Sequence, residues 1–418
     1  MAKLWNKGSD VNKEVEKYLF SDLWADQQLV KYECLASIAH AKMLSKIGIL
    51  NDSELTKLVF TLQGIIQLDE QNQFVLSLQD EDVHTKVENH LVQKLGELGK
   101  KIHTYRSRND QLLVNSRLYN KEKIGEVKSE LVNLIKVIVQ FAKKHEKVPM
   151  PGYTHMQKAM LSSVGLWAGA FAESLMDDLK VLENAYELND QCPLGSGASY
   201  GIPEQIDREY TAKLLGFSKA QNNVLYCQNS RGKFESVILN SLSQMMLDLA
   251  KMCQDIITFS TSEFGYFSLS SEVSTGSSIM PQKRNADVAE LVKGNASVML
   301  SYEFLVKNAI SGTNSGYVKE TQVVKEPTMK GLILAIDTLK VMQIQINGII
   351  VNEKKCIDSC TPGLFAADEA YDLVKKGVSF REAYKQVAQN LDKLKKRDPV
   401  AELEKRLKNK SFYLKLPG

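Results

Sequence analysis

Residues 233–264 read KFESVILNSLSQMMLDLAKMCQDIITFSTSEF and contain neither proline nor glycine. Within this stretch the apolar side chains recur every three or four positions, at Ile238, Leu242, Met245, Leu249, Cys253 and Ile256. That spacing puts them along one face of an α-helix. The stretch therefore predicts an amphipathic helix of about 30 residues, which would be about 45 Å long at the helical rise.

Three further tracts have the same helical character, at 126–147, from Gly169 to 192, and at 332–347. The first of them carries its apolar stripe at Val127, Leu131, Leu134, Ile138 and Phe141. Strand signals are weak, because alternation around Val351 is brief. We predict an all-α fold with an N-terminal helical domain at 1–106, a bundle of long helices at 107–350 and a small helical domain at 351–418.

The apolar stripes are wider than a two-per-heptad seam, so several neighbouring helices are needed to cover them. This width favours an oligomer that forms through the long helices. The alternative is a large monomeric helical protein.

Composition limits the functional class of the 418 residues. The net charge of +3 argues against a dedicated nucleic-acid binder, and the hydrophobic fraction of 44% is ample for a folded core. No apolar run is long enough for a membrane span, and MAKLWNKGSD lacks the apolar centre of a signal peptide. The six cysteines form no C-x-x-C pair, which suits a reducing compartment. We expect a cytoplasmic protein without a metal site.

Residues 274–290, STGSSIMPQKRNADVAE, interrupt the helical pattern with a Gly-Ser-Ser loop. Lys283 and Asn285 follow the loop hydroxyls closely. Such a group can hold a carboxylate through charge-assisted hydrogen bonds. The alternative is a helix-connecting loop in which Asn285 is the N-cap.

Two further segments are rich in polar side chains. Residues 103–111, HTYRSRNDQ, place Arg106, Arg108 and Asn109 together, a plausible anion-binding cluster. The alternative is a helix N-terminus capped by Ser107 or Asn109. Residues 150–157, MPGYTHMQ, offer His155 as an acid or base, although a lone histidine is more often structural.

The remaining polar segments lie far apart in the sequence. They are the Gly-Ser loop at 191–199, the segment GYVKETQVVKEP with Tyr317, Gln322 and Lys325, and the segment QDEDVHTKVE with Asp82 and His84. A single site made from all of these needs long helices that bring distant loops together, or several subunits that each contribute one loop.

The segment TGSSIMPQKRNADVAE resembles the signature loop of the fumarase/aspartase superfamily. One branch of it, that of argininosuccinate lyase and delta-crystallin, is resembled by the segments HTYRSRNDQ, MPGYTHMQ, PLGSGA, EDVHT and YVKETQVVKEP. The matches run from Leu4 and Trp5 to about residue 380. Several positions depart from the family pattern: Tyr105 replaces a usual glycine, Arg284 and Ala286 stand where Lys and Pro are common, and Val323 and Val324 replace an acidic pair.

The resemblance implies a helical three-part subunit in a homotetramer, with each active site formed where three subunits meet. It also implies an activity, the reversible cleavage of argininosuccinate to L-arginine and fumarate, the last step of arginine biosynthesis, without a metal or organic cofactor. The alternatives are another lyase of the superfamily, such as adenylosuccinate lyase, or a crystallin-like structural protein without turnover.

Roles for individual residues follow from the same resemblance. Ser277 would remove the succinyl proton as an alkoxide that Lys283 stabilises, and His155, oriented by Glu290, would relay protons. The fumarate-side carboxylates would be bound by Ser107, Arg108, Asn109, Thr154 and Asn285. The arginine side would be held by Asp26, Asp82, Tyr317, Gln322 and Lys325, and Arg231 would lie near the substrate.

Overall fold

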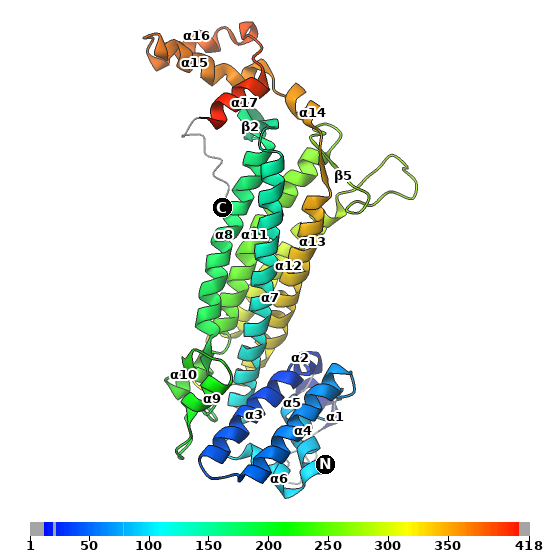
Figure 1. Ribbon diagram of the computed structural model, residues 1–418, viewed down its shortest axis with the longest axis vertical. Helices are drawn as coiled ribbons and strands as arrows, with labels where there is room; N and C mark the ends of the chain where they lie inside the picture. Colours follow the sequence, from blue (N-terminus) through cyan, green and yellow to red (C-terminus); the bar gives the residue numbers. More distant parts are fainter. Residues whose placement is uncertain (1–11, 20–21, 78, 409–418) are drawn as a thin grey trace. The chain divides into compact units, whose positions relative to one another are not determined.

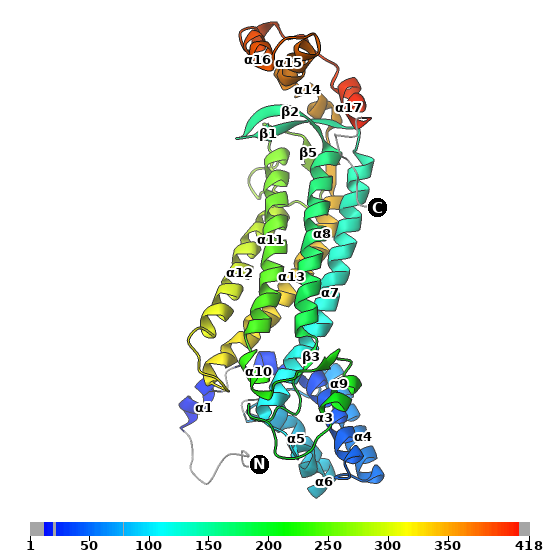
Figure 2. The ribbon, with the colours of Figure 1, turned by 90° about the vertical axis from the view of Figure 1, so that its left-hand side faces the viewer.

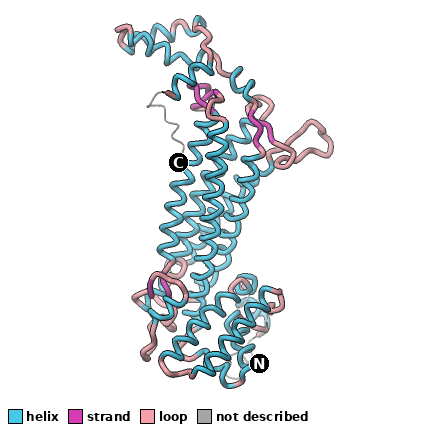
Figure 3. The backbone as a smooth tube through the Cα atoms, viewed as in Figure 1, coloured by secondary structure: helices cyan, strands magenta, loops and turns pink. Residues whose placement is uncertain are grey.

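The computed structural model describes residues 12–19, 22–77 and 79–408, and helices dominate this part of the chain (Figures 1 and 3). The motif residues Leu4 and Trp5 lie outside the described residues. The predicted all-α class is confirmed. The chain divides into two compact units, one formed by 1–127, 181–243 and 298–334, the other by 128–180, 244–297 and 335–418.

Five long helices contribute residues to both units: α7 (Arg108–Lys144), α8 (Val164–Asn189), α11 (Lys233–Ser260), α12 (Asp287–Ala309) and α13 (Lys325–Asn347). Within each unit, their segments lie side by side (Figures 1 and 2). The apolar stripe predicted on 233–264 is buried along its whole length, from Ile238 to Ile256. The stripe predicted on 126–147 is buried as well, from Val127 to Phe141.

Three of the predicted helices begin earlier than expected. The helix α7 begins at Arg108 rather than Glu126 and runs through Gly125, and α8 begins at Val164, before Gly169. The helix α13 begins at Lys325 rather than Leu332. A glycine inside a helix costs only about 1 kcal/mol, which packing of the buried Val114 and Leu118 outweighs. In α8, Gly165 also has a packing role, since a Cβ there would lie 2.6 Å from the Cα of Glu146.

The remaining helices of the first unit are mostly short. They are α1 (Lys13–Leu19), α2 (Leu23–Gln27), α3 (Val30–Lys46), α4 (Asp52–Glu70), α5 (Val83–Leu95), α6 (Glu97–Lys100), η1 (Lys101–His103), α9 (Arg208–Leu214), α10 (Val224–Asn229) and η2 (Lys319–Val324). Two short parallel strands, β3 (Gln191–Cys192) and β4 (Lys219–Ala220), pair within the same unit.

The second unit contains two short antiparallel pairs, drawn in magenta in Figure 3. They are β1 (Pro149–Thr154) with β2 (Gln157–Ser163), and β5 (Phe267–Leu269) with β6 (Ile349–Val351). The C-terminal part adds α14 (Glu353–Asp358), η3 (Pro362–Phe365), α15 (Ala366–Lys375), α16 (Phe380–Ala388), η4 (Leu391–Lys393) and α17 (Pro399–Leu407). The β1–β2 hairpin was not predicted from the sequence.

Candidate active site

A cavity of about 230 Å³ lies within the first unit, where side chains of α2, α5, α7 and the η2–α13 segment converge. Its lining is mostly charged, and both signs are present. Eight of the residues predicted for the site line it: Asp26, Asp82, Arg108, Asn109, Arg231, Tyr317, Gln322 and Lys325. The fold of a single unit therefore brings together residues that lie up to 303 positions apart, as Asp22 and Lys325 do.

Lys325 binds two carboxylates on the wall of this cavity. Its Nζ forms an ion pair with Asp26 and lies 2.7 Å from Oδ2 of Asp22. The side chains of Lys325 and Asp26 are both nearly inaccessible to solvent. Burial alone would lower the pKa of Lys325, but the charges of Asp26 and Asp22 outweigh it and raise that pKa. Lys325 is therefore held as a cation between two acids.

Arg108 also lines the cavity and binds two carboxylates. Its Nη1 donates to Oε1 of Glu81 at 2.7 Å and to Oδ2 of Asp82 at 3.1 Å, and its Nη2 donates to Oγ1 of Thr85 at 3.0 Å. Asp82 is also the N-cap of α5, because its Oδ1 accepts from the backbone N–H of Thr85 at 2.7 Å. These contacts fix the first turn of α5 against the start of α7.

Arg231 is buried and has unsatisfied hydrogen-bonding capacity. Its guanidinium lies over the ring of Tyr317, 5.6 Å from the ring centroid. Its Nη1 has no hydrogen-bond partner among the described residues. A buried donor without a partner costs free energy unless a ligand or water binds it. The cavity thus contains a buried N–H donor, on Arg231, to which an anionic group of a ligand can bind.

Residues 103–111 contain the helix N-terminus that was one interpretation of this segment, and anion binding by the same segment stays a prediction. Ser107 is the N-cap, since its Oγ accepts from the N–H of Asn109 at 3.2 Å, and Asp110 accepts from the N–H of Ser107 at 3.0 Å. Asn109 is not the cap. Tyr105, which stands where the family usually has glycine, has a φ of 60°, in the left-handed region that favours glycine.

Asp110 was not predicted as a site residue, yet it joins two predicted segments. It is fully buried, and its Oδ2 accepts from the backbone N–H groups of Gly195 and Gly197, both at 3.0 Å. The Gly-Ser loop at 191–199 is therefore anchored to the start of α7. Gly195 has a φ of 88°, and a Cβ there would lie 2.7 Å from Cδ1 of Ile206.

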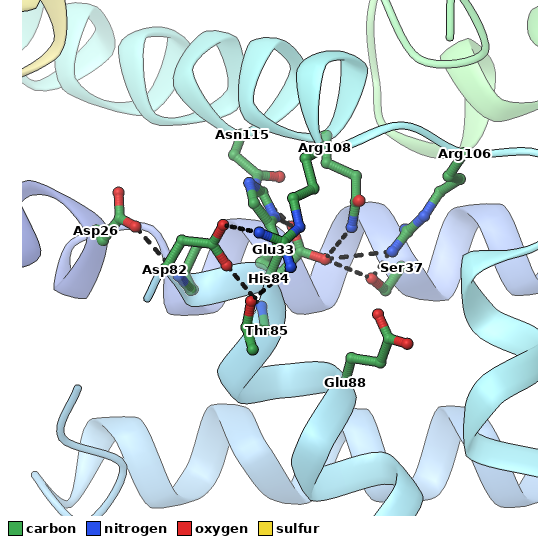
Figure 4. A network of polar contacts seen from close by, with 12 residues as sticks. Asp26, Glu33, Ser37, Asp82, His84, Thr85, Glu88, Arg106, Arg108 and Asn115 are labelled. Atoms are coloured by element: carbon green, nitrogen blue, oxygen red, sulfur yellow. Dashed lines mark hydrogen bonds and ion pairs between the residues drawn. The ribbon is translucent and has the colours of Figure 1, made fainter. Parts of the chain in front are cut away.

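Glu33 was also missed. It lies on α3 with 1% exposure, and donors surround it (Figure 4). Its carboxylate contacts Ser37, His84, Arg106, Gln111 and Asn115. One signal could have revealed it: Glu33 is the one carboxylate in a run of mostly small or apolar residues, YECLASIAHA. Charged residues are almost never fully buried unless they are paired, so a carboxylate in such a run indicates a structural or functional role.

The signature loop lies in the second unit. Ser277 is half-buried, and its Oγ accepts from the backbone N–H groups of Ile279 at 3.3 Å and Met280 at 3.2 Å. Asn285 forms a bridge with Thr275, and α12 begins at Asp287. The alternative reading of Asn285 as an N-cap is therefore wrong, because Ala286 separates it from the helix.

Two more predicted residues lie at the tip of the β1–β2 hairpin, also in the second unit. Thr154 pairs with Gln157, so His155 and Met156 form a two-residue turn. Both turn residues have positive φ, 51° and 59°. Two positive φ values are typical of a type I′ turn, which usually contains Asn or Gly. Thr154 and His155 are consequently exposed.

The proton-transfer residues are not joined to one another within the described chain. Lys283 and Glu290 are exposed, the first in the signature loop and the second on α12. Among the described residues, no hydrogen bond or ion pair links Ser277, His155, Lys283 and Glu290. Their exposure leaves them accessible to another chain.

Comparison with known proteins supports the sequence resemblance. A family described as Lyase matches residues 5–300. The argininosuccinate lyase of Thermotoga neapolitana is 44% identical over 388 residues, which cover 93% of this chain and 98% of that protein. The chain belongs to the argininosuccinate lyase family. A second member, from Sorangium cellulosum, is 38% identical over 97% of this chain and 94% of its own length.

Solved structures show the same fold for this family member. A crystal structure of EDDS lyase in complex with formate has a TM-score of 0.78 at 22% identity, covering 94% of this chain and 80% of that one. Fumarate lyase:delta crystallin from Brucella melitensis has a TM-score of 0.77 at 19% identity, covering 94% and 92%. Within the described residues of this carbon–nitrogen lyase, every helix is too short or too polar to span a bilayer.

Proposed function

We propose that this chain catalyses the reversible cleavage of argininosuccinate to L-arginine and fumarate. The observation that carries the proposal is the cavity of mixed charge in the first unit. Its carboxylates, Asp26 and Asp82, suit a substrate with cationic groups. Its cations, Arg108, Arg231 and Lys325, suit the carboxylates of the same substrate.

In the proposed reaction, Ser277 removes a proton from the carbon next to a succinyl carboxylate. The electron pair of that C–H bond moves into the carboxylate, and its return expels the nitrogen of arginine as fumarate forms. A serine hydroxyl is a weak base, so its alkoxide must be stabilised. The backbone N–H groups of Ile279 and Met280 donate to Ser277 Oγ, and Lys283 lies in the same loop.

The remaining predicted residues receive the roles that the family resemblance implies. His155, oriented by Glu290, supplies a proton to the departing nitrogen. Thr154 and Asn285 from exposed loops, together with Ser107, Arg108 and Asn109, bind the fumarate-side carboxylates. Asp26, Asp82, Tyr317, Gln322 and Lys325 hold the arginine side.

We also propose that the chain acts as a cytoplasmic homotetramer with three-part subunits divided near residues 106 and 350. Support for self-association comes from α12, which exposes Leu291, Val298, Leu300 and Phe304. Phe304 is 70% exposed. Large apolar side chains grouped on one helix are typical of a surface that another chain covers. The six cysteines are free and buried, as expected in a reducing compartment.

The activity is tested by following fumarate through its ultraviolet absorbance. The purified chain is incubated separately with argininosuccinate and with adenylosuccinate. Fumarate release from argininosuccinate alone is the expected result. Release from adenylosuccinate alone would identify a sister lyase, and release from neither would leave a structural protein of the crystallin kind.

A further inference from the structure

The proposed chemistry gives no role to the buried carboxylate of Glu33. Glu33 lies beside the cavity rather than on it, and Figure 4 shows it between α5 and the start of α7. Its Oε1 contacts Ser37 Oγ at 3.0 Å, Gln111 Nε2 at 2.9 Å and Arg106 Nη2 at 3.3 Å. Its Oε2 accepts from Asn115 Nδ2 at 2.7 Å and lies 2.6 Å from His84 Nδ1.

Five donors on one carboxylate fill its accepting capacity. Such a group is costly to bury unless its partners are charged or fully engaged. Packing of the core does not require these hydrogen bonds to Glu33, since an apolar side chain of similar volume would fill the same space. A second function for the carboxylate is indicated by the one partner that also reaches the cavity.

That partner is His84, the only residue that touches Glu33 and also lines the cavity among the described residues. The ring is 6% exposed. Nδ1 faces Glu33, and no hydrogen bond joins the opposite nitrogen, Nε2, to another described residue. In an imidazole, the partner of one ring nitrogen decides what the other nitrogen can do.

We propose that Glu33 is a positioning residue of the active site: it holds the His84 ring through Nδ1 so that Nε2–H donates to a carboxylate of the substrate in the cavity. This proposal rests on the proposed function for the identity of the substrate. Glu33 itself touches neither the cavity nor the substrate. Its effect is transmitted through the orientation and the charge of one imidazole.

The charges around His84 support this arrangement. Burial alone would lower the pKa of His84, but the charge and hydrogen bond of Glu33 outweigh it and raise that pKa above 6.5. The other acids that act on the ring are Asp82 from its own helix end and Asp26 from α2. Arg106, from the segment before α7, pairs with the same carboxylate of Glu33 at 3.3 Å. Lys325, which also lines the cavity, forms ion pairs with Asp26 and Asp22.

Removal of the Glu33 charge leaves burial as the main influence on the pKa of His84. In Glu33→Gln the ring loses its main charge partner and keeps its burial, so the imidazole becomes neutral at a lower pH. A neutral ring has only one N–H, which the remaining contact at Nδ1 can take. Nε2 would then face the substrate carboxylate as an acceptor, and binding would weaken.

The first test compares kcat and KM for argininosuccinate in Glu33→Gln, Glu33→Asp and Ser37→Ala. Ser37→Ala is the matched control, because it removes one hydrogen bond from the same carboxylate, together with the one that Ser37 accepts from Arg106 Nη1, without touching His84. We expect Glu33→Gln to raise KM at least about tenfold, with a smaller change in kcat, and Glu33→Asp to recover part of that loss. We expect Ser37→Ala to stay within about twofold of the unaltered chain. Equal KM values in Glu33→Gln and Ser37→Ala would overturn the proposal.

The second test follows the titration of His84 by NMR in chains with isotopically labelled histidine. The chain has six histidines, and the His84→Gln variant assigns the signal. The pKa of His84 should fall by at least about one unit in Glu33→Gln. An unchanged value would overturn the proposal. If Glu33→Gln does not fold, the unaltered chain decides: His84 mostly neutral at pH 6.5 overturns the proposal, and His84 mostly protonated supports it.

The two tests also separate this proposal from the proposed function. If the unaltered chain releases no fumarate from argininosuccinate, the proposed function fails, and the histidine titration still decides whether Glu33 controls the charge of His84. If fumarate is released but neither KM nor the pKa of His84 changes in Glu33→Gln, only the positioning role fails.

Discussion

Asp26 and Lys325 form a buried ion pair although 299 positions separate them in the sequence. Asp26 also accepts from the backbone N–H of Val83 at 3.1 Å, so the same carboxylate contacts the start of α5. This one residue therefore links α2, α5 and α13 at the wall of the cavity. The cavity wall therefore forms only when these three helices are packed together, and loss of the ion pair should lower the free energy of unfolding.

Replacement of Lys325 by methionine should destabilise the chain more than replacement of Asp26 by asparagine. Lys325→Met leaves two carboxylates, Asp22 and Asp26, without their shared cation. Breaking a buried pair from one side costs about 3–5 kcal/mol. Asp26→Asn leaves Lys325 with Asp22, so a smaller loss is expected. Urea unfolding of both variants provides the comparison, and an equal or larger loss in Asp26→Asn would refute this account of the pair.

His40 should make the chain sensitive to acid. Burial, assisted by the charge of Arg106, lowers the pKa of His40 to about 3, and Nε2 lies 2.8 Å from the carbonyl oxygen of Thr104. Below pH 6.5 the unfolded chain binds a proton that the folded chain refuses until about pH 3. Stability should therefore fall with acidification across this window, by about 1.4 kcal/mol per pH unit from this group.

The acid effect is measured by comparing unfolding free energies of the unaltered chain and His40→Gln between pH 6 and pH 4. We expect the difference between the two chains to shift in favour of His40→Gln as the pH falls. Parallel curves over this range would mean that His40 does not contribute to the acid sensitivity.

Asp110→Asn should loosen the Gly-Ser loop at 191–199. The carboxylate accepts three backbone N–H groups, from Ser107, Gly195 and Gly197. Asparagine offers one acceptor oxygen and an N–H₂ group that would face donors. We expect a loss of at least about 3 kcal/mol in unfolding free energy, compared with about 1 kcal/mol for Ser107→Ala, which removes only the cap. Hydrogen exchange at Gly195 and Gly197 should accelerate in Asp110→Asn alone; unchanged protection there would count against the anchor.

The long helices could be predicted from the sequence because their apolar periodicity is a local signal. Their beginnings could not, since Gly125 and Gly169 suggested breaks that tertiary packing overrides. The β1–β2 hairpin was missed for a different reason. Its turn consists of His155 and Met156 with positive φ, and neither residue type signals such a turn.

The cavity could be predicted in part. The loops that line it contain recognisable clusters, and eight of their residues do meet. Glu33 and Asp110 were missed because their partners lie on other elements, such as His84 for Glu33 and Gly195 for Asp110. Burial of a carboxylate depends on which donors the fold assembles around it, and the local sequence shows at most the apolar setting of Glu33, not its partners.

The most direct test of the central claim is the turnover of Ser277→Ala on argininosuccinate, with light scattering to confirm that its oligomeric state equals that of the unaltered chain. Removal of a positioned base lowers a rate by about 10²–10⁴-fold. We predict a loss of fumarate production of at least about a hundredfold in an assembly of unchanged mass. A variant that keeps half of the original rate or more would contradict the assignment of Ser277 as the base.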